Sequence, residues 1–208
     1  MTVLNRVGFV LIIIGIVIGA YYSFEWYHGK NSTQDLTTEE IQRFEKASPT
    51  KNSTETTVNS QVPSSQMHYK EGEKVAELNI PKIKKKFSVY WGASDATLKK
   101  GVGMFVSNST TTPSESGHTV LSGHRDTVFT ELGELKEKDN LIVEYDNNIY
   151  TYEIQKTWIT NADDRTVIVK KEEPILTLTT CYPFDYIGDA PDRYIIEAKL
   201  IATAPKMS

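Results

Sequence analysis

Cysteine is nearly absent from this sequence of 208 residues, in which Cys181 is the only one. A single cysteine excludes an intramolecular disulfide, so no disulfide framework indicates the compartment in which the chain works. The histidines are scattered, and without a second cysteine they make no zinc-ligand spacing; they are His28, His68, His118 and His124. We therefore expect neither a structural metal ion nor a bound cofactor.

The chain also lacks an excess of positive charge. Its formal net charge is −4 at pH 7, and the four lysines between Lys82 and Lys86 form a cluster typical of a solvated surface. This balance gives no electrostatic reason to expect a nucleic acid as partner. The length and the 39% hydrophobic content are sufficient for one core-forming domain with appendages.

Only one long apolar run is present, from Val7 to Phe24, where 18 residues carry no charge. That length reaches the threshold for a membrane-spanning helix and exceeds the apolar region of a cleaved signal peptide. Aromatic residues suited to the lipid headgroup region follow at its end; they are Tyr21, Tyr22, Trp26 and Tyr27. We expect residues 1–27 to be a single-pass membrane anchor, and a buried core helix is the alternative. The small excess of positive charge before the run, from Arg6 and the terminal amine against Lys30 after it, predicts that the N-terminus lies inside and the rest of the chain on the extracellular face.

Residues 28–72 are rich in Ser, Thr, Asn, Gln, Glu and Lys. Such a segment buries too little apolar surface to offset the entropy lost on ordering, so it is predicted to be a polar tether. Within it, Thr37 or Thr38 followed by Glu40 is a capping pattern, which predicts a short amphipathic helix over about 38–47.

From residue 73 to residue 208 the sequence has an all-β pattern, in which short strands are separated by turn residues. About eight strands in such a length favour a closed barrel over a flat sheet with two exposed edges. One short helix is predicted over residues 128–135, and Asp146-Asn147-Asn148 is predicted to be a hairpin connection. The expected strands are 75–80, 86–90, 119–122, 141–145, 149–154, 157–160, 166–169, 175–182 and 194–201.

The strand over residues 175–182 ends in the single cysteine. Side chains alternate between the two faces of a strand, so Leu176, Leu178 and Thr180 should share the core side. Cys181 would then lie on the more polar side, at a strand end that a substrate can reach. A buried structural thiol is the alternative, since a free cysteine is often buried.

A reactive cysteine needs a proton-transfer partner and a donor for developing negative charge. His124, in a Ser-Gly-His-Arg loop after a predicted strand, is a candidate base, with His118 as its competitor. Arg193 opens the last predicted strand, where its forked donors could hold a substrate carbonyl or an oxyanion. The alternatives are a surface histidine and a solvated strand-end arginine.

Five motifs together resemble the sortase family of Gram-positive bacteria, and most closely its class D members. They are Leu78-Asn79-Ile80-Pro81-Lys82-Ile83, Leu98-Lys99-Lys100-Gly101-Val102-Gly103, His124-Arg125-Asp126-Thr127-Val128-Phe129, Leu178-Thr179-Thr180-Cys181 and Arg193-Tyr194. The resemblance implies an eight-stranded barrel with Cys181 as nucleophile, His124 as general acid and base, and Arg193 as oxyanion or substrate clamp. One departure is Met104, at a position where many relatives have histidine.

The resemblance also implies a function, which is transpeptidation in the hydrolase class. The expected partners are surface proteins with a C-terminal LPxTG-like or LPxTA-like signal, a peptidoglycan-precursor amine and the membrane. The loops after Thr157 and between Cys181 and Arg193 are expected to set specificity, the second through apolar residues such as Tyr182, Phe184 and Tyr186. Another cysteine peptidase and a non-catalytic surface β-domain remain the alternatives.

Overall fold

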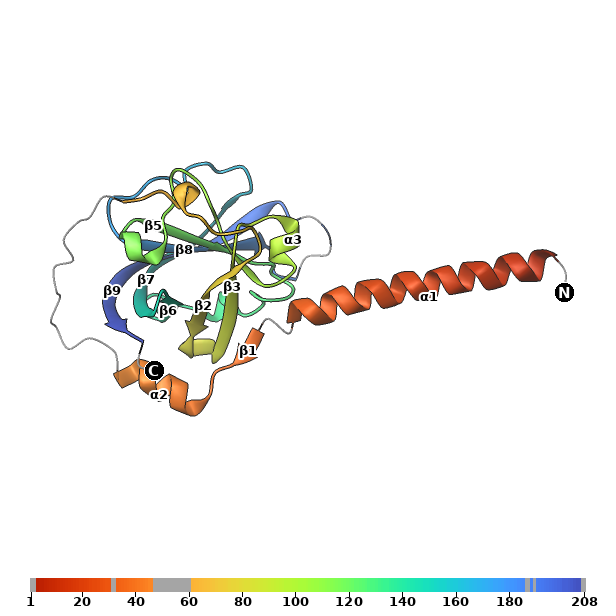
Figure 1. Ribbon diagram of the computed structural model, residues 1–208, viewed down its shortest axis with the longest axis horizontal. Coiled ribbons are helices and arrows are strands. Elements are labelled where there is room, and N and C mark those ends of the chain that lie inside the picture. The colour runs from red at the N-terminus through yellow and green to blue at the C-terminus, as the bar shows by residue number, and fades with distance from the viewer. Residues whose placement is uncertain (1–2, 31–32, 47–60, 186–187, 189, 207–208) are drawn as a thin grey trace.

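The protein is a closed β-barrel with a long helix projecting from it (Figure 1). The computed structural model describes residues 3–30, 33–46, 61–185, 188 and 190–206. The helices are α1 (Val3–Lys30), α2 (Thr38–Lys46) and α3 (Asp95–Leu98). The strands are β1 (Thr33–Asp35), β2 (Lys74–Ile80), β3 (Lys85–Trp91), β4 (Val102–Met104), β5 (His118–Ser122), β6 (Asn140–Tyr145), β7 (Asn148–Asn161), β8 (Ile175–Tyr182) and β9 (Asp192–Pro205). Four 3-10 turns are η1 (Ser64–Gln66), η2 (Pro81–Ile83), η3 (Pro113–Glu115) and η4 (Leu132–Glu134).

Eight of these strands form the barrel, in the order β3-β2-β6-β7-β9-β8-β5-β4, and a parallel pairing of β4 with β3 closes it. This confirms the predicted closed eight-stranded barrel. The closing pair is short, because β4 pairs only with the second half of β3, from Val89 to Trp91. The first half of β3 pairs on that side with β1, which becomes a ninth strand outside the barrel.

The core follows the alternation expected of a barrel wall. Every barrel strand contributes at least one large inward side chain that is fully or almost fully buried, including Leu121 of β5 and Ile196 of β9. Between β6 and β7, Asp146 and Asn147 both have positive φ, at 46° and 57°. This two-residue hairpin confirms the predicted connection, since Asp and Asn tolerate the left-handed region.

Three sequence-based predictions about elements are wrong in detail. The segments 149–154 and 157–160 belong to one strand, β7, which register shifts near Thr151 and Gln155 bend without ending. Residues 166–169 form no strand, and the short strand β4 replaces them in the count of eight. Its three residues were too few to be recognised from periodicity.

The predicted helix over residues 128–135 is also wrong, because turns and the 3-10 turn η4 occupy this region. Its apolar spacing nevertheless reflects burial, since Phe129, Leu132 and Leu135 all belong to the core. Gly133 interrupts the segment where a Cβ would lie about 3.1 Å from the Phe184 ring. Glycine in the middle of so short a segment disfavours an α-helix.

Helix α1 contains the apolar run Val7–Phe24, which is long and apolar enough to cross a membrane and is not buried against the barrel. In Figure 1 it projects from the barrel as a single rod. The following segment, Thr33–Lys46, comprises β1 and α2 and lies against the barrel; we call it the β1–α2 strap. Helix α2 begins and ends within one residue of the predicted range. Residues 47–60 of the predicted tether lie outside the described residues.

Candidate functional site

Strand β8 brings Cys181 to one end of the barrel. Leu176 and Leu178 are fully buried in the core, and Thr180 is almost fully buried on the same side. Cys181 points to the opposite side and is partly exposed. The expected alternation is therefore present, and the thiol is accessible rather than buried.

Arg193 lies directly opposite Cys181 in the antiparallel pair of β8 and β9. Side chains at such opposed positions have Cβ atoms about 4.5–5.5 Å apart, so the register alone places the guanidinium beside the thiol. Nη1 of Arg193 donates hydrogen bonds to the carbonyl oxygens of Ala190 and Asp192, at 3.2 and 2.9 Å. These bonds fix one side of the planar fork and direct the remaining donors toward the pocket.

His124 belongs to a loop that is attached to the strand of Cys181. The amide of Gly123 donates to the carbonyl oxygen of Thr179 at 3.2 Å, and the hydroxyl of Thr180 donates to the carbonyl oxygen of Gly123 at 2.7 Å. A Cβ on Gly123 would come within 2.7 Å of side-chain atoms of Val128 and Phe129. Glycine therefore lets these core side chains pack against the backbone directly before His124.

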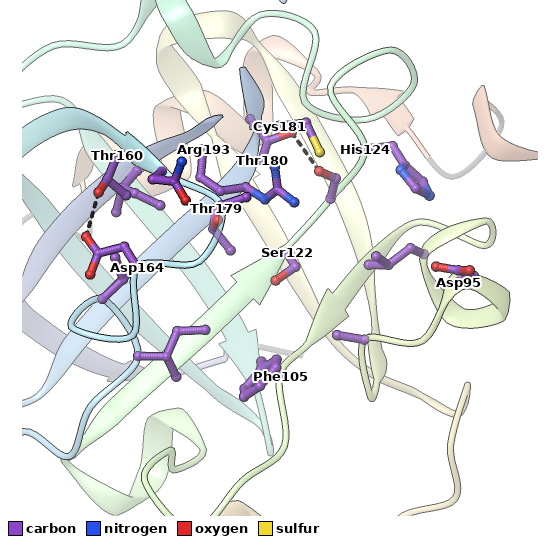
Figure 2. Close-up of a pocket in the computed structure, with 18 residues that line it drawn as sticks. Asp95, Phe105, Ser122, His124, Thr160, Asp164, Thr179, Thr180, Cys181 and Arg193 are labelled. Carbon is purple, nitrogen blue, oxygen red and sulfur yellow. Dashed lines mark hydrogen bonds between the residues drawn. The ribbon is translucent and has the colours of Figure 1, made fainter. Parts of the chain in front are cut away.

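One pocket contains all three residues predicted as the site (Figure 2). Its volume is about 450 Å³, within the range typical of ligand sites. Figure 2 shows the Cys181 sulfur directed to the side on which the His124 ring lies, with Arg193 extending into the same space. The structure thus brings together His124, Cys181 and Arg193, which are separated by up to 69 positions in the chain.

The wall of the pocket facing away from His124 comes from the loop between β7 and β8. Val167 and Ile168 supply an apolar surface, and Asp164 lies beside them. The Asp164 carboxylate accepts hydrogen bonds from the hydroxyl of Thr160 and from the hydroxyl and amide of Thr166, and these bonds lower its pKa. These hydrogen bonds to Asp164 stabilise the conformation of the loop and so keep Val167 and Ile168 at the groove.

The Sortase domain family matches residues 78–201, which is more than half of the chain. The chain belongs to the sortase family. Sortase D of Bacillus subtilis (strain 168) is 38% identical over 195 residues, which are 92% of this chain and 96% of that protein. The catalytic domain of B. anthracis SrtD is 82% identical with a TM-score of 0.60, covering 69% of this chain and 97% of that chain. Sortase C from Clostridium perfringens, solved with the C-terminal cell wall sorting motif, is 26% identical with a TM-score of 0.57, covering 64% of this chain and 73% of that chain.

The competing histidine of this sortase, His118, lies outside the pocket and is fully buried on β5. Its Nδ1 lies 2.6 Å from the carbonyl oxygen of Val169, and its Nε2 lies 2.8 Å from the hydroxyl of Thr177. A carbonyl oxygen only accepts, so Nδ1 carries the proton and Nε2 accepts from Thr177. Burial lowers the pKa of His118. His118 therefore fastens the β7–β8 loop to the barrel as a neutral ring.

The aromatic residues after Cys181 do not form a wall of the sortase pocket. The rings of Tyr182, Phe184 and Tyr194 pack on one another with centroids 5.3–6.2 Å apart, and Phe184 and Tyr194 also contact the barrel core. They close the barrel end, because Tyr182 and Tyr194 lie on the sides of their strands that face the barrel interior. The expectation that they line a substrate pocket is not supported for these residues, and Tyr186 lies outside the described residues.

Several pocket residues of this sortase were not identified from its sequence. They are Ala93, Asp95, Leu98, Phe105, Ser122, Asp164, Val167 and Ile168. Leu98 and Ser122 lie within or beside the family motifs, so proximity to those motifs was a usable signal. Asp164, Val167 and Ile168 lie in the loop after Thr157, which was expected to set specificity although its residues were not named. The remaining residues come from segments whose contact with the site depends on barrel closure. Among the described residues, no group of three or more His, Cys, Asp or Glu side chains could hold a metal ion.

Proposed function

We propose that this sortase is a membrane-anchored cysteine transpeptidase that cleaves an LPxTG-like or LPxTA-like sorting signal after its threonine. The threonine would then be joined to an amine of a cell-wall precursor. The observation that supports this proposal is that Cys181 lies directly opposite Arg193 in the β8–β9 pair, in a pocket that also contains His124.

Cys181 is the proposed nucleophile. Its sulfur attacks the threonine carbonyl carbon, so that a carbon–sulfur bond forms and the carbon–nitrogen bond to the next residue breaks. The thiol proton passes to His124 and then to the leaving amine. The resulting thioester retains enough reactivity for an incoming amine to restore an amide without ATP, while His124 accepts the proton of that amine.

Arg193 is the proposed donor for the carbonyl oxygen, which becomes an oxyanion as either intermediate forms. Its guanidinium is held in advance by the carbonyl oxygens of Ala190 and Asp192. Donors that are already oriented stabilise developing charge without a cost of reorganisation during the reaction. The strand register therefore places the Arg193 guanidinium beside Cys181, and the two hydrogen bonds to backbone carbonyls fix its orientation.

The apolar part of the groove suits the leucine and proline of such a signal. Leu98 and Ile195 line the pocket together with Val167 and Ile168 of the β7–β8 loop. The C. perfringens sortase C structure contains a cell wall sorting motif, which supports this class of substrate for a member of the same family. The proposed signal lies along these residues, with its threonine carbonyl at Cys181.

The decisive experiment incubates the full-length chain in detergent with quenched Leu-Pro-x-Thr-Gly and Leu-Pro-x-Thr-Ala peptides, with and without an amine acceptor. Cleavage that disappears in Cys181→Ala, with a peptide adduct on Cys181 detected by intact mass, is the expected result. Transfer to the amine separates a transpeptidase from a simple cysteine peptidase. His124→Ala should abolish turnover, whereas the exposed control His68→Ala should not. Cleavage that persists in Cys181→Ala would sink the proposal.

A further inference from the structure

The β1–α2 strap is bound to the barrel by a surface of its own. Backbone pairing places Thr33, Gln34 and Asp35 opposite residues 85–87 of β3, and the amide of Leu36 then donates to the carbonyl oxygen of Lys84 at 2.8 Å. The strap therefore covers the part of the β3 edge that β4 leaves open. An exposed strand edge is a liability, and pairing is one way to remove it.

Apolar side chains of the strap cover a second, smaller core on the outside of the barrel. Leu36 and Phe44 are only 6% and 4% exposed, and they pack with Ile142 of β6 and Ile149 of β7. Ile41 adds a half-buried contact. Because burial of large apolar side chains is favourable, Leu36 and Phe44 stabilise the docked strap.

Charges on the strap match those on the barrel. Asp35 pairs with Lys85 at 2.8 Å, and Glu40 pairs with Lys86 at 2.9 Å. Three residues further along α2, Arg43 lies 3.2 Å from Glu144, a carboxylate only 7% exposed. A buried carboxylate needs such partners, and Lys206 supplies another at 2.7 Å.

The docked strap does not occupy the catalytic groove. Among the described residues that line the pocket, none belongs to Thr33–Lys46. In Figure 1, α2 lies near the C-terminus, whereas α3, which lines the pocket, lies toward the other side of the barrel. Docking therefore leaves the groove open and changes only the length of chain that connects the barrel to α1.

Docking of the strap shortens the connection between the membrane-spanning part of α1 and the barrel. The apolar span of α1 ends at Phe24 and β1 begins at Thr33, so only residues 25–32 connect them. Eight residues reach at most about 27 Å even when fully extended. After the strap, the next described contact with the barrel is made by Gln61, whose side chain donates to the carbonyl oxygen of Ser116, and the 36 residues 25–60 span at most about 120 Å when fully extended.

We propose that the β1–α2 strap holds the catalytic barrel against the membrane surface, so that its groove acts on sorting signals that emerge directly from the same bilayer. This inference rests on the membrane anchoring and substrate class proposed above. Its partner is the bilayer together with a membrane-bound substrate. The effective concentration of linked groups falls with about the −3/2 power of linker length. Lengthening the connection from eight residues to thirty-six therefore lowers it roughly tenfold.

The distance between the catalytic barrel and the membrane can be measured without enzyme activity. Full-length protein carrying Cys181→Ala and a donor dye on Glu172→Cys, an exposed position, is placed in phosphatidylglycerol vesicles containing acceptor-labelled lipid. The double variant Leu36→Asp/Phe44→Asp should show lower energy transfer to the lipid. The matched control Gln42→Asp, at an exposed position of α2, should not. Equal transfer in all three proteins would overturn the proposal.

The effect of the strap on catalysis is tested by comparing the turnover of a soluble and a membrane-anchored substrate, with Cys181 intact. Leu36→Asp/Phe44→Asp should cleave a soluble signal peptide within twofold of the parent, which also shows that the barrel is folded. Cleavage of the same peptide anchored in the vesicle by a lipid chain should fall roughly tenfold. An insertion of 28 Gly and Ser residues after Lys30, with the strap intact, should reproduce that loss. An unchanged rate with this insertion would overturn the proposal, whereas absence of soluble-peptide cleavage in the parent would instead contradict the proposed function.

Discussion

The Thr180 hydroxyl donates a 2.7 Å hydrogen bond to the carbonyl oxygen of Gly123, across a buried contact between β8 and the loop after β5. Thr180 directly precedes Cys181, and Gly123 directly precedes His124. Together with the bond from the Gly123 amide to Thr179, this bond connects the strand of the proposed nucleophile to the loop of the proposed base, 57 positions apart. Small errors in such a placement are costly in catalysis, because reacting groups must stay within hydrogen-bonding reach.

Replacing Thr180 with valine should separate this positional effect from packing. Valine keeps the shape but leaves the Gly123 carbonyl without its donor, which costs about 1–3 kcal/mol of unfolding free energy. We expect kcat for a signal peptide to fall about tenfold or more, and Thr180→Ser to recover most of it. Urea unfolding and steady-state kinetics provide the two readouts. A kcat for Thr180→Val equal to that of the parent would show that the bond does not position His124.

Arg193→Lys should be almost as damaging as Arg193→Ala. Lysine keeps the positive charge but loses the planar fork that Ala190 and Asp192 hold in place. Loss of one preorganised donor to an oxyanion lowers the rate by about 10²–10³-fold. Single-turnover acylation by a signal peptide measures this step directly. Arg165→Lys, at an exposed position of the β7–β8 loop, is the matched control and should acylate at the parent rate.

His118 should make the stability of the barrel depend on pH in mildly acidic solution. Its folded-state pKa lies below its ordinary value near 6.5, because burial disfavours the charged ring, with Lys171 and Glu197 acting in opposite directions. The unfolded chain therefore binds more protons as the pH falls below 6.5, and unfolding becomes easier until the folded-state pKa is passed. Thermal melts from pH 7.5 to pH 5 should show this decline in the parent.

In His118→Gln the decline should be reduced, whereas the exposed variant His68→Gln should behave as the parent does. His118→Gln should also raise KM for the signal peptide more than it lowers kcat, because the β7–β8 loop lines the groove through Val167 and Ile168. Identical pH profiles for the parent and His118→Gln would contradict the assignment of a neutral buried ring.

The strap should loosen from the barrel in acid. Glu40 accepts hydrogen bonds from the amide and hydroxyl of Thr37 and from Lys86, and chiefly the backbone bond lowers its pKa to about 2. Its contribution to docking is therefore complete above its ordinary value of 4.5 and is lost as the pH falls toward 2. Hydrogen exchange of α2 amides should accelerate in Glu40→Gln at neutral pH. Glu39→Gln, its exposed neighbour, should exchange as the parent does.

The barrel, and the meeting of His124, Cys181 and Arg193 in one pocket, could be predicted because the signals are local. Alternation along β8, the two turn residues Asp146 and Asn147, and short motifs around His124 and Cys181 depend on few neighbours. The docking of the strap could not be predicted, since its partners Ile142 and Ile149 lie about a hundred positions away. The groove wall at Val167 and Ile168 was mistaken for a strand because β-branched residues look alike whether they pair or line a pocket.

Strand β4 makes the two shortest pairings in the barrel wall, with three paired residues to β3 and two to β5, and α3 lies between β3 and β4 in the chain. Gly103 allows β4 to approach the carbonyl oxygen of Gly92 so closely that any side chain there would collide with it. The amide of Gly92 extends the β3–β4 pairing by donating to Met104 at 3.0 Å. Because local opening begins where the fewest bonds must break, thermal breathing of this barrel should start at this seam. Leu98 and Phe105, which line the pocket, would then move with β4. The width of the groove therefore depends on how stable the backbone pairing of β4 is.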